Sequence, residues 1–302
     1  MVIHNPETLV KYVSVDTALQ ILNSQSMRWS APHLFKDPFE LNHLSGLSFD
    51  PQAILGAAIQ AANAMIFAKD EPRGMAPLTV VIRRWREEER FQSPDEALDV
   101  LKELLSQMVD NRLQLLDQLM VDWRKFCRTL RICSFSAKPD NVAAWTHFAD
   151  NHRGVAIRLQ CGEFTSLPKP QQVSYRPIRP EITSMKEQLD VVLTNQAFDA
   201  QEHFFEKFTS KSLHFASEAE WRCFRQVKDE VGADAKPESE WYEDVKFERN
   251  DVTAIYFGAQ TDPKAMRQIY AIIKEKYNQA KVFQAKTAAG KYEIEFNRIT
   301  NG

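Results

Sequence analysis

Hydrophobic residues recur along this chain with two different periods, and each period predicts one kind of element. Where apolar and polar residues alternate over a short stretch, or form a short apolar run, the pattern predicts a strand. Such stretches occur at residues 10–13, 26–32, 130–136, 155–160, 172–177, 218–227, 244–248, 252–258, 281–286 and 292–296. Strands are therefore expected near the N-terminus and through most of the second half.

Helical spacing, with apolar residues three and four positions apart, marks the segments between these stretches. A helix is expected at Asp16, whose side chain can cap its first turn. The same spacing predicts helices at residues 141–152, at about 183–210 and from Asp262 to Ile273. Strands and helices are thus mixed without a regular strand–helix–strand rhythm, which predicts an α+β fold.

The longest helical tract covers residues 52–129. Its clearest start signal lies in the middle: Ser93 can act as an N-cap, Pro94 occupies the first helical position and Glu96 can complete a capping box. Apolar residues then recur at helical spacing, a stripe that is typical of a core or of a partner-helix surface. We therefore expect this tract to be a helical insertion within a single domain spanning 1–302.

Composition and charge narrow the class of protein. The 302 residues are 44% hydrophobic and 26% charged, an ordinary balance for a globular chain. The formal net charge of −3 gives no overall attraction to nucleic acid or to an acidic membrane surface. No run is apolar enough to predict a membrane span, and the N-terminal residues lack the pattern of a signal peptide. We therefore expect a cytoplasmic protein with no membrane partner.

The cysteines and glycines argue against two common kinds of site. The four cysteines are scattered, form no Cys-x-x-Cys pair and have no histidine at metal-ligand spacing, so no metal is expected. Scattered thiols also fit a reducing compartment. The chain has nine glycines and no glycine-rich phosphate-binding motif. Any chemistry must therefore come from other groups.

Two glutamates stand one residue apart in "SEAEWRCFR", residues 217–225. In an extended chain, Glu218 and Glu220 would point to the same side with like charge. Two readings follow: a solvated strand edge, or a catalytic pair of carboxylates. Arg222 lies two residues further on and is a candidate structural partner for Glu220.

Six segments, in order, resemble a bacterial family named domain of unknown function 2971. They are "KYVSVDTALQIL", "MRWSAPHLFKDPFE", "CSFSAKPDNVAAWTHFADNHRGVAIRL", "VSY", "EAEWR" and "AIYFG". The resemblance extends over nearly the whole chain, with the tract 52–129 as an insertion. Lys36 stands where the family usually has Asn, and Thr146 and Phe148 replace the usual Ser and Tyr around His147. The family name assigns no activity, but related proteins occur beside phage-defence genes, which implies a defence setting.

Part of the chain also resembles ADP-ribosyltransferases, which open with a strand bearing a polar residue and later carry a serine strand and a Glu-x-Glu motif. Here residues 11–22 resemble the opening, and Glu218-Ala219-Glu220 resembles the final motif. Ser134 and Ser136 resemble the serine strand, with Ser-Phe-Ser in place of the commoner Ser-Thr-Ser. The resemblance implies a mixed, largely antiparallel sheet.

It also implies that the protein uses NAD as a substrate and transfers ADP-ribose to a macromolecular acceptor. Cleavage of the nicotinamide–ribose bond passes through an oxocarbenium-like state, which a nearby carboxylate stabilises. That carboxylate would be Glu220, while Glu218 would orient the acceptor or take its proton. An arginine would pair with the pyrophosphate, and Arg28 is the candidate.

The other candidate nucleotide contacts come from the same segments. Lys11, Tyr12 or Arg28 would supply the polar group of the opening strand, and Ser134 and Ser136 would lie beside it. An aromatic ring would stack on nicotinamide, and Tyr12 and Trp145 are candidates for it. His147 would line the same cleft, or be a satisfied, partly buried histidine.

Three functions remain open at the level of sequence. The first is an ADP-ribosyltransferase-like enzyme acting as a toxin or phage-defence effector, whose helical insertion contacts a target, an inhibitor or another copy. The second is a non-catalytic sensor or adaptor in a defence system, with Glu218 and Glu220 facing solvent. The third is a metal-dependent nuclease or hydrolase using Asp37, Glu40 and His147, which the ligand spacing disfavours.

Overall fold

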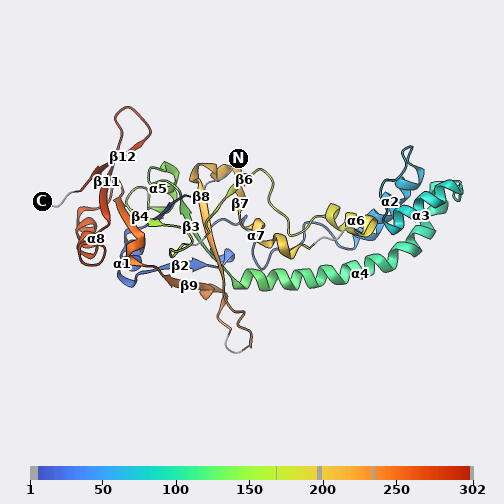
Figure 1. The fold of residues 1–302 in the computed structure, drawn as a ribbon, viewed down its shortest axis with the longest axis horizontal. Coiled ribbons are helices and arrows are strands. Elements are labelled where there is room, and N and C mark those ends of the chain that lie inside the picture. The colour runs from blue at the N-terminus through green and yellow to red at the C-terminus, as the bar shows by residue number, and fades with distance from the viewer. Residues whose placement is uncertain (1–5, 168, 196–198, 233–234, 300–302) are drawn as a thin grey trace. The chain divides into compact units, whose positions relative to one another are not determined.

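The computed structural model describes residues 6–167, 169–195, 199–232 and 235–299 (Figure 1). The chain forms two compact units. The first consists of Met1–Glu40, Cys127–Arg179 and Phe208–Gly302, and the second consists of Leu41–Phe126 and Pro180–Lys207. The second unit therefore takes in most of the tract 52–129 and a later segment as well.

The first unit is built on a mixed and mostly antiparallel sheet, in agreement with the α+β prediction. In the described part of the chain the sheet has ten strands: β1 (Thr8–Val13), β2 (Ser26–Ser30), β3 (Leu130–Ser136), β4 (Val155–Gln160), β5 (Gln171–Gln172), β8 (Glu220–Gln226), β9 (Tyr242–Lys246), β10 (Val252–Phe257), β11 (Lys281–Thr287) and β12 (Ile294–Arg298). The order is β12-β11-β10-β4-β1-β3-β2-β9, and β8 pairs with β3 and β5. The described pairs within this sheet are antiparallel except β10–β11.

Three helices cover this sheet: α1 (Val15–Ser24), α5 (Val142–Phe148) and α8 (Pro263–Lys276). Because successive strand residues point to opposite faces, each strand contributes to two apolar clusters. Leu9 and Ile157 pack in the cluster that contains the apolar sides of α1 and α8. Val10 and Ala156 pack in the other cluster, beneath α5. Helices thus lie on both faces, and the face under α5 carries the candidate site.

The sheet is weakly joined at β3. Strands β1 and β4 pair along six positions, whereas β1 meets β3 in register only at Val10 and Ser136. The pairing of β2 with β3 is also reduced to one position, Ser30 with Ile132. In contrast, β3 pairs with β8 along its full length of seven residues. The β3–β8 ribbon therefore pairs with β1 only near its Ser136 end.

The second unit is helical, and the tract 52–129 is confirmed as helix broken by turns. Its helices are α2 (Ala53–Phe67), α3 (Pro77–Glu87), α4 (Pro94–Thr129, whose last turn lies in the first unit), α6 (Met185–Thr194) and α7 (Phe204–Lys207). The buried residues of α2 recur every four positions at Ile54, Ala58, Ala62 and Ile66. Among the helices that the structure describes, none has the length and apolar composition that a membrane span needs.

Several details differ from the sequence prediction, and two of them concern helices. The single helix expected at about 183–210 is wrong, because α6 ends at Thr194 and Asn195 adopts the left-handed conformation that commonly terminates helices. Residues 196–198, in the middle of that prediction, lie outside the described residues. The cap of α1 is Ser14, which accepts from the Thr17 amide, while Asp16 lies within the first turn.

The junction of α5 and β4 gives a test of the packing. Gly154 lies so close to β1 that a Cβ there would be 2.2 Å from the Val13 carbonyl oxygen. We expect Gly154→Ala to lower the free energy of unfolding by about 1–3 kcal/mol, measured by urea denaturation. Gly56→Ala in α2, where a Cβ meets open space, should instead raise stability by about 0.5–1 kcal/mol. Equal stability of the two variants would contradict this packing.

Candidate functional site

Three strands bring distant parts of the sequence to one place on the face under α5. In the β3–β8 ladder, Ser136 lies opposite Glu220 and Ser134 lies opposite Arg222. Val10 of β1 lies opposite Ser136 on its other side. The opening strand, the serine strand and the second glutamate are therefore neighbours, although more than 200 residues separate the first from the last.

The two glutamates do not share an extended strand, so that prediction is wrong. Glu218 ends a short 3-10 helix (η3, Leu213–Glu218), Ala219 turns the chain with φ of 46°, and β8 begins at Glu220. The sharp turn nevertheless leaves both carboxylates facing one cation. Lys211 Nζ lies 2.5 Å from Glu218 Oε2 and 3.1 Å from Glu220 Oε2.

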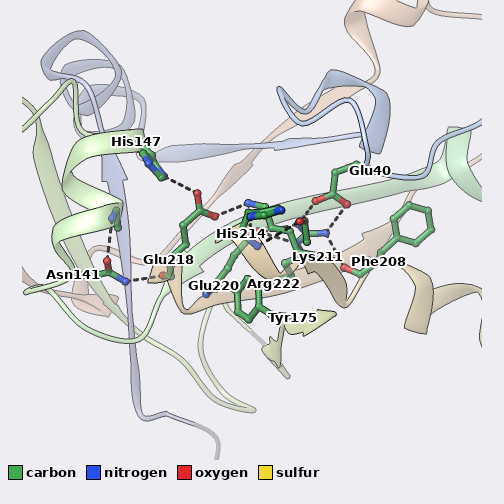
Figure 2. A network of polar contacts seen from close by, with 12 residues as sticks. Glu40, Asn141, His147, Tyr175, Phe208, Lys211, His214, Glu218, Glu220 and Arg222 are labelled. Atoms are coloured by element: carbon green, nitrogen blue, oxygen red, sulfur yellow. Dashed lines mark hydrogen bonds and ion pairs between the residues drawn. The ribbon is translucent and has the colours of Figure 1, made fainter. Parts of the chain in front are cut away.

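These groups belong to a chain of alternating charges, drawn in Figure 2. Arg222 contacts Glu40 with two guanidinium nitrogens, and its Nε donates to Glu220 Oε1 over 2.8 Å. From Glu220 the chain passes through Lys211 to Glu218, whose other oxygen lies 2.8 Å from His147 Nδ1. The prediction of solvated carboxylates is wrong, because Glu218 and Glu220 are only 3% and 4% exposed. The ion pair between Arg222 and Glu220 is confirmed.

Burial decides the strength of these contacts. Burial alone would raise the pKa of Glu220, but Arg222, Lys211 and the Ser134 hydroxyl outweigh it and lower the pKa to about 2. Burial alone would lower the pKa of Arg222 and Lys211, yet the carboxylates around each raise it. The Glu220 amide also donates to the Tyr175 hydroxyl over 2.7 Å. The central groups thus stay charged across the physiological range.

The network and the recess beside it bring carboxylates and cations together in near balance. Three carboxylates, those of Glu40, Glu218 and Glu220, face two cations, Arg222 and Lys211. Lys11, whose ammonium group lines the recess with Glu218 and Glu220, supplies a third cation beside the network. A carboxylate fixed in this way stabilises positive charge that develops next to it in a site with little water.

His147 connects the buried network to the surface. Its side chain is 44% exposed, and it projects from α5, whose N-cap Asn141 accepts from the Ala144 amide. Asn141 also donates to the Glu218 backbone carbonyl over 2.7 Å, which ties the start of α5 to the end of η3. One ring nitrogen of His147 is therefore held by a buried carboxylate, an arrangement that fixes a histidine for proton transfer.

A small recess lies over this network. It has a volume of about 60 Å³, room for only a few water molecules, and its walls include Lys11, Tyr12, Ser136, Glu218 and Glu220. The Ser136 hydroxyl is buried and, within the described residues, has no hydrogen-bond partner. Buried hydroxyls are normally satisfied, so an unpartnered one in the wall of this recess is unusual.

A much larger groove adjoins the recess. Its volume is about 1190 Å³, ample for a ligand of dinucleotide size, and Lys11, Tyr12 and Phe148 line both hollows. His147 and Arg28 also line the groove. Arg28 pairs with Asp244 at an exposed position, which is a weak interaction that a bound anion can replace.

Of the predicted nucleotide contacts, Trp145 and Arg28 do not line the recess, whereas Tyr12 and Lys11 do. Trp145 is fully buried, and its indole nitrogen donates to the Pro139 carbonyl over 2.7 Å, so it is not available for stacking on a ligand. Tyr12 packs edge-on against Trp145, and its hydroxyl donates to the Lys138 carbonyl over 2.5 Å. Arg28 does not reach the recess. Lys11 does, and its ammonium donates to the Ser134 carbonyl over 2.8 Å.

Lys211 was not predicted as a site residue, and Glu40 was not predicted to lie with the glutamate pair. Lys211 occupies β7 (Ser210–Ser212), which pairs in parallel with β6 (Ser174–Arg176). Nothing in its local sequence distinguishes it from a surface lysine. The proposed set of Asp37, Glu40 and His147 does not converge, because Glu40 is bound to Arg222 and His147 to Glu218. Among the described residues, no cluster of three or more His, Cys, Asp or Glu could hold a metal.

Comparison with known protein families gives a match to part of the chain. A family described as "Protein of unknown function (DUF2971)" matches residues 144–223 of this chain. That segment contains His147, Lys211, Glu218 and Glu220, and it is shorter than the near full-length resemblance expected from the sequence. A search of curated proteins and a search of solved structures returned no significant match.

Because the pKa of Glu220 is lowered, the free energy of unfolding should vary with pH in the acidic range. The folded-state pKa of about 2 lies below the ordinary value of 4.5, so the charged form favours the folded state. This contribution, about 3 kcal/mol, is present above pH 4.5 and is lost as pH falls towards 2. Urea denaturation at several pH values should show it in the wild type and not in Glu220→Gln.

Glu295→Gln is the matched control, because Glu295 pairs with Lys286 at the surface and is about half exposed. It should keep the wild-type pH dependence. If the free energy of unfolding of Glu220→Gln fell with pH in parallel with that of the wild type between pH 4.5 and 2, the buried ion pairs would not lower the pKa of Glu220.

Proposed function

We propose that this protein cleaves the nicotinamide–ribose bond of NAD and transfers ADP-ribose to a macromolecular acceptor. The observation that carries the proposal is the convergence of the opening strand, Ser136 and the Glu218–Glu220 turn on one recess. The resemblance to ADP-ribosyltransferases implies this grouping, and its members come from segments far apart in the sequence.

The two hollows supply a place for each part of NAD. The groove has the volume for a dinucleotide, and Lys11, Lys36 and Arg28 on its walls can meet the pyrophosphate. The recess is too small for nicotinamide. It receives only the edge of the reacting ribose, where the Ser136 hydroxyl can bond a ribose hydroxyl.

Glu220 is assigned to charge stabilisation. When the glycosidic bond breaks, nicotinamide leaves with the electron pair and the ribose becomes oxocarbenium-like. A carboxylate that stays ionised and fixed by Arg222 and Lys211 stabilises that positive charge without reorganising.

His147, hydrogen-bonded to Glu218, is assigned the role of general base for the acceptor. With its Nδ1 proton held by Glu218, the lone pair on Nε2 can take the proton as the acceptor oxygen attacks the ribose carbon. This modifies the role first given to Glu218, because the exposed histidine stands between that carboxylate and the groove. The helical second unit supplies a surface for the acceptor, an inhibitor or another copy, as expected of a toxin or phage-defence effector.

A non-catalytic sensor or adaptor is the second candidate, and one observation favours it. Both oxygens of Glu220 are already occupied by Arg222 and Lys211, as in a structural ion pair. Such a module would bind NAD or a similar nucleotide in the groove and release no nicotinamide.

The first test measures nicotinamide release from NAD by chromatography and transfer of labelled ADP-ribose to protein, RNA and DNA acceptors. Glu220→Gln should lower the rate by about 100-fold or more, because it removes a fixed charge beside the developing cation. Glu295→Gln should keep the wild-type rate. Binding of NAD to the wild type without nicotinamide release would identify the second candidate, and absence of both would overturn the proposal.

The second test separates chemistry from folding. His147→Asn should lower kcat by about 100-fold and leave KM and thermal stability nearly unchanged, because the side chain is half exposed and acts on the acceptor proton. His203→Asn, an exposed histidine of the second unit, is the control. A His147→Asn variant with wild-type kcat would remove His147 from the mechanism.

A further inference from the structure

The opposite end of the β3–β8 ladder brings two like charges together. Arg131 of β3 lies directly opposite Arg225 of β8. Like charges in a cross-strand pair repel and destabilise a sheet unless something of opposite charge lies between or beside them. This end of the ribbon lies apart from the recess, since Arg131 is three positions along β3 from Ser134, the nearest residue of that strand in the recess wall, roughly 10 Å.

Arg131 is buried and incompletely paired. It is only 5% exposed, and one terminal nitrogen donates to the carbonyls of Leu130 and Arg128 over 2.9 and 2.6 Å. Its Nε has no partner within the described residues, and the ion pairs found there include none of its own. Burial lowers the pKa of Arg131, while Glu243 and Glu230 nearby act to raise it, so its charge is compensated only in part. A buried guanidinium that is only partly compensated favours an anion beside it.

The neighbouring carboxylates supply that anion only in part. Each of the three that line the surrounding hollow already has a cation, in the pairs Asp229–Arg128, Glu243–Arg225 and Glu230–Lys236. Lys228 also lines the hollow, and the described ion pairs do not include it. Two positive charges, those of Arg131 and Lys228, are therefore in excess.

The hollow has the size of a small-molecule site, with a volume of about 510 Å³. We propose that it binds a phosphate monoester, with the Arg131 guanidinium and Lys228 beside the phosphate. Two excess cations match the charge of about −1.5 to −2 that such a group carries at neutral pH. Arginine and lysine side chains both favour phosphate oxygens as acceptors. The proposal is independent of the reaction proposed for the recess, and it gives the chain a second ligand.

Isothermal titration of the full chain with inorganic phosphate, AMP and acetate tests this inference. Phosphate and AMP should bind, acetate should bind at least tenfold more weakly, and added salt should weaken phosphate binding. Tighter binding of AMP than of inorganic phosphate would assign the site to a phosphorylated metabolite, and equal binding would assign it to the phosphate group alone.

Three variants locate the site. Arg131→Gln and the surface variant Lys228→Glu should each weaken AMP binding at least tenfold, while Arg298→Gln on β12 should bind as the wild type does. If Arg131→Gln fails to fold, Lys228→Glu carries the test, because that side chain is exposed. Absence of binding, equal binding of acetate, or wild-type affinity in Lys228→Glu would overturn the proposal.

Discussion

The buried guanidinium of Arg222 is the interaction on which the site depends. At 1% exposure it joins Glu40, from a turn after the second strand, to Glu220 at the start of β8. It also donates to the Phe208 carbonyl, so it fixes the segment that leads into β7 and Lys211. Removing either partner of such a pair leaves a buried charge, which costs about 3–5 kcal/mol. The positions of Glu218 and His147 follow from this arrangement, because Lys211 and Glu218 connect them to it.

The sequence predicted the elements well where periodicity is strong. The strands "LRICSFS" and "VAIRLQ" appear as β3 and β4, and the capping signal at Ser93 and Pro94 marks the start of α4. The failures lie where local conformation overrides periodicity. Residues 218–220 alternate as a strand would, yet Ala219 adopts a left-handed conformation. An alternating pattern cannot reveal such a turn, because its cause is the tertiary pairing of both glutamates with Lys211.

The candidate site was predictable only in part, for a similar reason. Short motifs drew attention to Ser134, Ser136 and the glutamates, and the sheet brings these residues together. Trp145 looked equally suitable as a stacking ring, but its position on the inner side of α5 buries it. Lys211 and Glu40 gave no local signal, since ion pairing between segments far apart in sequence depends on the fold. Motifs therefore located the strands of the site, and only the structure located its counter-charges.

The β3–β8 ribbon carries an unsatisfied buried polar atom at each end. At one end the Ser136 hydroxyl lies beside Glu220, whose own oxygens are paired, and at the other end the Nε of Arg131 lies on a residue that faces another arginine. Folding alone favours neither atom, because a buried polar group without a partner costs free energy. The two proposals made above place a ligand at each end. The ribbon would then hold a place for developing positive charge at one end and for a bound anion at the other, and its full-length pairing would keep the two places at a fixed separation.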